Sequence, residues 1–401
     1  MTRTGWRVAL TAGALTAIAM GGRQAFGVFV SPLNTATGLG LAAISLALAL
    51  GQLGIGLAQP LVGRWADRAG PTRVIMLGAG VLALSTMAPV LTLAAPVLFA
   101  SLVLSAMAGS AVGSNGLLMG AVSRSVSPGD AGLAVGVVGA GASVGQLVLG
   151  PLLPWLIGAF DWQSALLALA ALSLVAFPLA RVLREVPQPP AGAATAAAPL
   201  ADALRDAAFW RPALSFAICG LHVAFLAAHM PGAIERCGFP SGVAGAWIAL
   251  AGAANIVGSL GSGMLMKRLN HARWLASLYV VRAVGILAFV LVPPTLASLL
   301  AFAVVMGASH MATLPPTSSL IAQRFGTARL GTLFGMVMLV HQAGSFVGIW
   351  LGGWLAQHTG GDSAFWAIDV LLALAAAALV WPWRSSFHAP APSTTALATK
   401  S

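Results

Sequence analysis

Apolar stretches about twenty residues long follow one another along almost the whole chain, separated by short polar connections. A helix of about 20 residues crosses the roughly 30 Å hydrocarbon core of a bilayer, so each stretch has the length of one transmembrane helix. The pattern predicts an all-α membrane protein with twelve spans, at residues 6–31, 41–62, 74–93, 96–121, 131–155, 163–182, 209–231, 243–266, 274–294, 296–320, 331–356 and 363–383.

Lysine and arginine residues lie almost entirely in alternate polar connections. An even number of spans places both termini on one side of the membrane. With the N-terminus in the cytoplasm, all but three of the 20 Lys and Arg residues are cytoplasmic. Arg236 is outside, and Arg23 and Arg282 lie within spans. Because cytoplasmic loops are enriched in Lys and Arg, this distribution predicts that both termini are cytoplasmic.

The composition excludes an ordinary soluble protein, since only 7% of the 401 residues are charged and 59% are hydrophobic. The net charge of +11 is explained by the cytoplasmic loops and does not indicate nucleic-acid binding. The first apolar run is too long for a signal peptide, so we expect it to be retained. Two cysteines are too few for a disulfide framework, and no phosphate-binding loop or catalytic constellation is apparent. We therefore expect no enzyme activity, no cofactor and no resident metal.

The longest polar break divides the spans into two sets of six. Residues 185–208 are rich in Pro and Ala, which is typical of a loose linker. The predicted domains are a bundle at 1–184, this cytoplasmic linker, and a bundle at 209–384, followed by a disordered tail at 385–401.

The two halves contain related segments. The connection at 63–73 reads GRWADRAGPTR, and the connection at 263–273 reads GMLMKRLNHAR, with Gly, Arg and Arg at the same spacing. Duplicated six-helix halves around a central site are a common plan of transporters. The repeat therefore predicts two pseudo-symmetric six-helix bundles.

These features resemble the major facilitator superfamily. The connection 63–73 is similar to that family's signature between its second and third helices, with a glycine, Asp67-Arg68, a second glycine and Arg73. The resemblance implies a gate at the cytoplasmic interface of the bundles, formed by Asp67, Arg68 and Arg73. The second copy has Lys267 in the position of Asp67, so the full gating role is assigned to the first copy.

Within the superfamily, the chain looks most like the bacterial branch related to monocarboxylate and oxalate transporters. The segments Arg23–Phe29 and Pro60–Gly63 carry this resemblance. Monocarboxylate transporters typically place a cation in helix 1, near the position of Arg23. They often carry an arginine in helix 8 as well, where this chain has Asn255 and no arginine.

The resemblance also implies that helices 1, 4, 7 and 10 line a central cavity and that helices 2, 5, 8 and 11 form the gates between the bundles. Most polar residues within spans fall on these helices, where water or substrate can solvate them. The substrate-binding candidates are Arg23, Gln24, Asn115, Gln146, His222, His229, His310, His341 and Gln342.

Arg23 is the most informative of these residues. A guanidinium keeps its proton, so its burial in lipid is costly unless it faces water or a bound anion. Arg23 lies about 22 Å along its helix, too deep to reach the cytoplasmic surface. We interpret it as an anchor for a carboxylate; the alternative is a buried arginine bound to backbone carbonyls or glutamine side chains.

Histidine is the expected proton carrier, because Asp369 is the only carboxylate within a span. His222 and His229 are seven residues apart and share one helix face, which favours a common role in the cavity. The alternative for each is a hydrogen bond between helices. Arg282 is interpreted as a structural tie within the C-terminal half, with Asp369 as a possible partner.

The sequence favours a monomeric secondary transporter of the bacterial inner membrane. It would move a small organic anion, a monocarboxylate, with proton symport and by alternating access between the two halves. Its partners would be the small-molecule substrate and membrane lipid. Two alternatives stay open: a carrier of an amphipathic neutral molecule such as a drug or vitamin, and a copper importer using the pairs His229-Met230 and His310-Met311.

Overall fold

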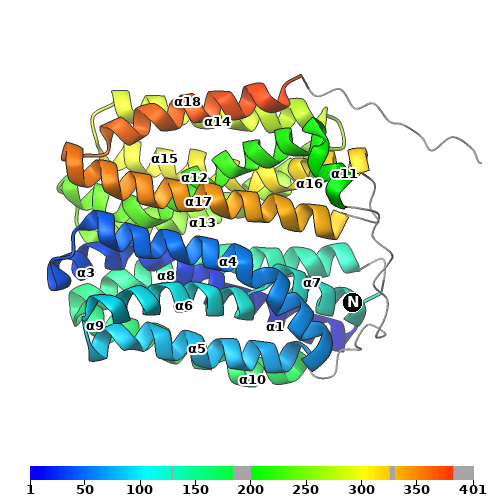
Figure 1. Cartoon of the computed structure of the whole chain (residues 1–401), viewed down its shortest axis with the longest axis horizontal. Coiled ribbons are helices and arrows are strands. Elements are labelled where there is room, and N and C mark those ends of the chain that lie inside the picture. Colours follow the sequence, from blue (N-terminus) through cyan, green and yellow to red (C-terminus); the bar gives the residue numbers. More distant parts are fainter. Residues whose placement is uncertain (128–129, 184–199, 326–329, 383–401) are drawn as a thin grey trace, which may run out of the picture.

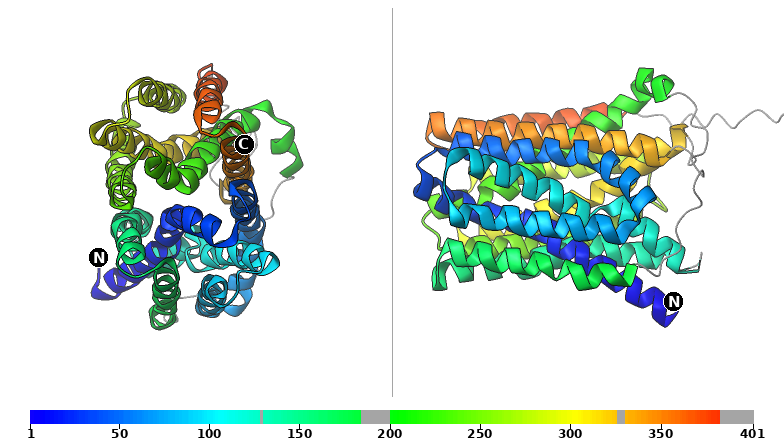
Figure 2. Two further views of the ribbon diagram at one scale, coloured as in Figure 1. Left: turned by 90° about the vertical axis from the view of Figure 1, so that its left-hand side faces the viewer. Right: turned by 60° about the horizontal axis from the view of Figure 1, so that its bottom comes forward.

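The computed structural model describes residues 1–127, 130–183, 200–325 and 330–382, and every regular element within these ranges is a helix. Figure 1 shows long helices that run side by side in two groups, and the end-on view in Figure 2 separates the two bundles. The first described helix begins, and the last ends, at the same end of the molecule (Figure 1). The all-α membrane fold predicted from the sequence is confirmed.

The N-terminal bundle is the lower one in Figure 1. It contains α1 (Arg3–Thr16), η1 (Ala17–Gly21), α2 (Gly22–Ala25), η2 (Phe26–Phe29), α3 (Val30–Thr37), α4 (Leu41–Ala69), α5 (Pro71–Leu91), α6 (Ala95–Val112), α7 (Asn115–Ser125), α8 (Ala131–Ala159), α9 (Trp162–Leu174) and α10 (Ala176–Val182).

The C-terminal bundle begins after the linker. It contains α11 (Leu200–Arg205), α12 (Ala207–Arg236), α13 (Ser241–Leu265), α14 (His271–Leu291), α15 (Leu296–His310), η4 (Met311–Thr313), α16 (Leu314–Phe325), α17 (Leu330–Thr359) and α18 (Ser363–Val380). Of the predicted linker 185–208, residues 185–199 lie outside the described ranges, as does the predicted tail 385–401.

Eleven helical segments in the described ranges are long and apolar enough to cross a membrane. The remaining predicted span, 6–31, corresponds to the interrupted helix from α1 to α3. Most span boundaries differ from the sequence prediction by a few residues, and the largest difference is in α4, which continues beyond residue 62 to Ala69. The turn of the signature connection is reduced to Gly70, whose φ of +84° favours glycine, and Pro71 then begins α5.

Three spans of the cavity-lining set are interrupted. The first contains the π-helical turn η1 and the 3₁₀ turn η2, the fourth breaks at Gly113 and Ser114, and the tenth contains the 3₁₀ turn η4. Irregular backbone at membrane depth is tolerated where it lines a cavity or is buried in protein. The breaks therefore indicate where the transmembrane bundle encloses polar space.

The apolar core changes along the length of the molecule. At the end opposite the termini, one cluster contains residues of both bundles, such as Phe29 and Leu153 together with Trp247 and Phe302. At the end that carries the termini, the core divides into separate clusters. One is entirely N-terminal and the other entirely C-terminal.

Glycines at the bundle interface show the same asymmetry. A Cβ atom on Gly245 would lie 2.7 Å from the carbonyl oxygen of Gly150, so α8 and α13 meet backbone to backbone. Gly136 and Gly139, nearer the termini on α8, would each place a Cβ atom in open space. The bundles are thus joined at the end opposite the termini and separated at the other end.

This asymmetry gives a stability prediction. A Cβ atom on Gly27, in η2, would collide with the Ala227 carbonyl oxygen of α12 and lie in tight contact with that of Ala228. We expect Gly27→Ala to lower the free energy of unfolding by about 1–3 kcal/mol, the usual range for overpacking. The matched control Gly136→Ala should raise stability by up to about 1 kcal/mol, because alanine favours a helix. Thermal unfolding of the purified variants shows whether Gly27→Ala lowers the unfolding temperature and Gly136→Ala raises it. Equal changes in the two variants would contradict the asymmetry between the two ends of the molecule.

Candidate functional site

A cavity of about 240 Å³ lies between the two bundles. The interrupted first, fourth and tenth spans contribute to its wall, together with α4, α12 and α17. One part of the wall is apolar and includes Leu82, Leu102, Met119 and Leu169. The polar lining residues are Arg23, Gln24, Gln52, Gln59, Thr86, Ser105, Ser110, Ser173, His310, His341, Gln342 and Ser345.

Arg23 lines this cavity from α2, the short helix between the π and 3₁₀ turns. Its Nη1 donates a hydrogen bond to Oε1 of Gln52, at 3.3 Å. Its buried Nε has no hydrogen-bond partner, and no carboxylate of the described residues lies within ion-pair distance of it. Arg23 is therefore a cation with unused donor capacity facing polar space, as an anion site requires.

A short polar chain connects Arg23 to the C-terminal bundle. Gln52 Oε1 also accepts a hydrogen bond from Nε2 of Gln342, at 3.3 Å. Oε1 of Gln342 lies 3.2 Å from Nδ1 of His341. The ring of His341 packs on Phe216, with ring centres 4.5 Å apart. The chain thus links the first two spans to the eleventh across the bundle interface.

Gln52 and Gln59 are cavity residues that the sequence analysis missed. A neutral amide within an apolar run costs less than a charge, so each residue alone gives a weak signal. The two residues are seven positions apart on α4 and share one helix face. That spacing is the sequence feature that could have identified them.

Gln24 and His310 both line the cavity, as expected. Gln146 does not reach it, but accepts a hydrogen bond of 3.2 Å from Nδ2 of Asn255, which joins α8 to α13. Asn255 therefore belongs to the contact between the bundles. Gln146 and Asn255 both line a second, smaller pocket beside the cavity.

His222 and His229 lie outside the cavity, so the expectation that their shared helix face points into it is wrong. Nε2 of His229 lies 2.9 Å from the carbonyl oxygen of Ile349, in a contact between α12 and α17. Nε2 of His222 lies 3.0 Å from Oδ1 of Asp369 on α18. This second contact has ion-pair distance, although its angles fall outside hydrogen-bond geometry. Both histidines tie helices of the C-terminal bundle together.

The suggested pairing of Arg282 with Asp369 is also wrong, because Asp369 pairs with His222. Arg282 is completely buried and donates from Nη2 to the carbonyl oxygens of Ser309 and His310, at 2.7 and 3.3 Å. Its Nε donates to Oγ of Ser309, at 3.2 Å. These carbonyls stand at the interruption of the tenth span, so Arg282 holds that break within one bundle.

The gating candidates lie at the end that carries the termini. The side chains of Asp67 and of the substrate candidate Asn115 lie outside the described part of the structure. Arg68 and Arg73 are exposed, and neither forms an ion pair with the acidic groups that the structure describes. The gate therefore stays a prediction.

Ion pairs near the termini join parts of a single bundle. The amino group of Met1 lies 3.1 Å from Oδ2 of Asp130, and Arg324 binds Asp206 at 2.9 Å. Burial raises the pKa of Asp206, but the Ala208 N–H and Arg324 outweigh it and hold that pKa below its usual value. Neither of these two ion pairs links the two bundles.

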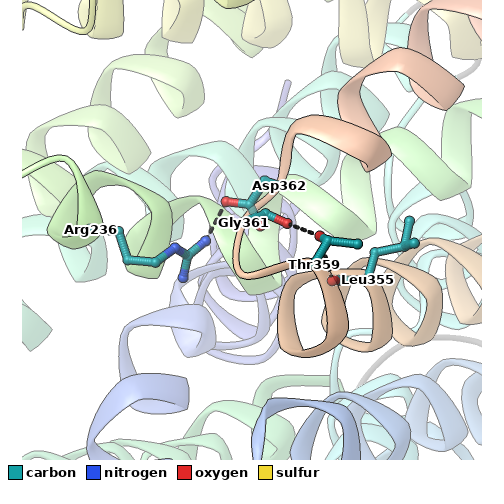
Figure 3. Close-up of polar contacts among 5 residues, drawn as sticks. All are labelled: Arg236, Leu355, Thr359, Gly361 and Asp362. Atoms are coloured by element: carbon teal, nitrogen blue, oxygen red, sulfur yellow. Dashed lines mark hydrogen bonds and ion pairs between the residues drawn. The ribbon is translucent and has the colours of Figure 1, made fainter.

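Arg236 stands at the opposite end of the molecule and binds Asp362, as Figure 3 shows. Oγ1 of Thr359 donates to the carbonyl oxygens of Leu355 and Gly361 in the same corner (Figure 3). The ion pair connects the end of α12 to the α17–α18 connection, and the Thr359 hydrogen bonds stabilise that connection, away from the cavity.

The copper hypothesis gains no support from the arrangement. Within the described ranges, no group of three or more His, Cys, Asp and Glu residues could hold a metal ion. Of the two His-Met pairs, His310-Met311 lines the cavity and His229-Met230 does not. Imidazole and thioether ligands from both pairs are therefore not brought together.

Comparisons with known proteins agree with this architecture. The sequence profile of the Major Facilitator Superfamily matches residues 12–301 and 279–401. Two curated relatives are both named Monocarboxylate transporter 13. The Rattus norvegicus protein is 24% identical over 367 residues, which cover 91% of this chain and 85% of its own. The Bos taurus protein is 25% identical over 392 residues, which cover 96% of this chain and 91% of its own.

Solved structures share the fold. An inward-facing, occupied bacterial homolog of the human lysosomal transporter Spinster has a TM-score of 0.74 at 16% identity, covering 95% of this chain and 97% of its own. A mutant of the nucleoside transporter NupG has a TM-score of 0.75 at 13% identity, and the match covers 95% of this chain and 100% of the NupG chain. At these identities the similarity establishes the fold alone.

Proposed function

The chain belongs to the Major Facilitator Superfamily, and from this membership we propose that it is a secondary transporter of a small organic anion, a monocarboxylate. Arg23 carries the proposal, because it is a permanent cation in the cavity with a buried, unpartnered Nε. A carboxylate can accept two hydrogen bonds from one guanidinium, in a geometry that fixes its orientation. The names of the curated relatives support the same substrate class.

Proton symport is the second part of the proposal. The cavity contains His310 and His341, and no acidic side chain of the described residues lines it. An imidazole can gain and release a proton, so these side chains are the proposed sites at which a proton binds on the same side as the anion. Co-transport of one proton with one carboxylate makes the step electroneutral, which avoids moving net charge through the membrane.

Alternating access is the third part of the proposal, and the asymmetry of the bundles supports it. We propose that the state described is open at the end with the termini and closed at the other end, where Gly150 and Gly245 meet. Lys and Arg crowd the polar connections at the open end, which supports cytoplasmic termini in a bacterial inner membrane. We expect a monomer, since each chain contains both bundles and the cavity between them.

An amphipathic neutral cargo is the second candidate. The apolar wall formed by Leu82, Leu102, Met119 and Leu169 favours a ligand with an apolar part. This candidate does not use the charge of Arg23, and uptake of a neutral compound would be independent of that charge.

Uptake into proteoliposomes tests the proposal. We expect labelled lactate or pyruvate to enter faster when the external pH is about 6 and the internal pH about 7.5, because protons then move inward with the anion. A labelled neutral amphipathic compound and liposomes without protein are the controls. Uptake of the neutral compound alone would favour the second candidate. Carboxylate uptake that ignores the pH gradient would remove proton symport from the proposal.

A further inference from the structure

A second pocket, of about 30 Å³, lies beside the main cavity. We call this space the side pocket. Its polar lining residues are Gln24, Gln146, Trp247, Asn255, Arg282 and His310. Four residues line both spaces and form the partition between the side pocket and the cavity: Gln24, Val223, Ala227 and His310. The side pocket lies where the contact between α8 and α13 meets the break in the tenth span.

Arg282 brings a positive charge to this pocket. Its side chain is completely buried, and the described acidic residues form no ion pair with it. Three of its hydrogen bonds go to Ser309 and His310, but Nη1 has no partner. Neutral carbonyl groups offset part of the cost of burying a guanidinium and leave its net charge uncompensated.

Two further buried polar atoms at the side pocket have no partner. They are Nε1 of Trp247, whose side chain is 4% exposed, and Oδ1 of Asn255, whose side chain is 2% exposed. An unpaired buried polar atom destabilises the folded state, because it has lost its hydrogen bonds to water. A reversal of the Asn255 and Gln146 amides would keep their mutual hydrogen bond and turn an Asn255 N–H toward the pocket. Three residues around the pocket, Arg282, Trp247 and Asn255, thus each carry a polar atom without a partner.

The volume limits the ligand. A space of about 30 Å³ accommodates two or so water-sized groups, since one water needs at least about 10–15 Å³ on this scale. We propose that the side pocket binds a compact monovalent anion, held by Arg282 and Trp247. The anion is a halide such as chloride or a carboxylate group that enters past Gln24 and His310. This site is separate from the proposed Arg23 anchor and does not depend on the transported substrate.

Thermal unfolding of the purified full-length protein tests the inference. We expect sodium chloride and sodium bromide to raise the unfolding temperature saturably, compared with sodium gluconate at equal ionic strength. Trp247→Phe keeps an aromatic side chain, smaller than the indole, and removes the N–H donor, so the anion concentration at half-saturation should rise several-fold. The matched control Trp155→Phe, at a side chain that is 61% exposed, should leave it unchanged.

The Arg23→Ala protein distinguishes the side pocket from the main cavity. Halide stabilisation that persists in Arg23→Ala supports the side pocket, whereas its loss there would assign the ion to Arg23 and overturn the inference. Sodium formate provides the second arm: stabilisation by formate and not by chloride identifies a carboxylate as the ligand. No stabilisation by any of these anions would overturn the inference and leave water as the occupant. Equal half-saturation concentrations in Trp247→Phe and wild type would place the anion away from Trp247 and would overturn it as well.

Discussion

Arg23→Ala should reduce uptake of labelled monocarboxylate nearly to the level of liposomes without protein. The substitution removes the cation with unused donors in the cavity and leaves Gln52 without its hydrogen bond from the guanidinium. Loss of one partner of a buried, hydrogen-bonded charge pair typically costs 2–5 kcal/mol, and about 1.4 kcal/mol is tenfold in affinity. We therefore expect apparent affinity to fall by more than tenfold, measured from initial rates over a range of substrate concentrations.

Two variants make this result specific. Arg23→Lys keeps the charge but not the planar pair of donors, so its affinity should lie between those of wild type and Arg23→Ala. Arg236→Ala removes an arginine that binds Asp362 far from the cavity and should transport normally (Figure 3). Normal carboxylate uptake by Arg23→Ala would remove the anchor from the mechanism. The fold and the family of the protein would be unaffected by that result.

Asp369→Ala should produce the largest loss of stability. Asp369 and His222 are both completely buried, and their pairing connects α18 to α12. Removal of one partner of a buried polar pair leaves the other partner unsatisfied, which typically costs about 1–3 kcal/mol and more for a charged group. A thiol-reactive dye can follow unfolding, since Cys219 is buried and reacts only when the bundle opens, whereas Cys237 is exposed.

The double variant His222→Leu/Asp369→Leu provides the internal control. Apolar replacement of both members of a buried pair is often neutral or stabilising, so the double variant should unfold at a higher temperature than Asp369→Ala. If the double variant is less stable than Asp369→Ala, the two residues stabilise the bundle through contacts other than their pairing. Substrate affinity in the folded fraction should stay unchanged, because neither residue lines the cavity.

The sequence predicts the fold well because membrane insertion imposes strong rules on composition. Span length, the Lys and Arg distribution and the repeated connection all concern the number and direction of helices. The interruptions were harder to predict: η1 and η4 depend on how neighbouring helices satisfy the freed backbone groups. Arg282 supplies such contacts to the tenth span from α14, and nothing near His310 in the sequence indicates it.

The cavity was predictable only in part. Arg23 could be identified because a permanent charge in an apolar run must face polar space. The spacing of His222 and His229 correctly placed them on one face of α12. It could not show that this face turns toward other helices of the same bundle, because the rotation of a helix depends on all its neighbours. Gln52 and Gln59 were not predicted, because the free-energy cost of placing an uncharged amide in a membrane span is smaller than that of placing a charge there.

The contacts of Arg282 have a mechanical consequence. A helix bends most easily where its backbone hydrogen bonds are interrupted. Here the Arg282 guanidinium, on a neighbouring helix of the same bundle, donates hydrogen bonds to the carbonyl oxygens of Ser309 and His310 at the interruption. These hydrogen bonds stabilise the bend near His310, so we expect this segment to move as a rigid unit. In the proposed alternating-access cycle, we therefore expect the His310 wall to move together with the rest of the C-terminal bundle, about the backbone contacts between α8 and α13.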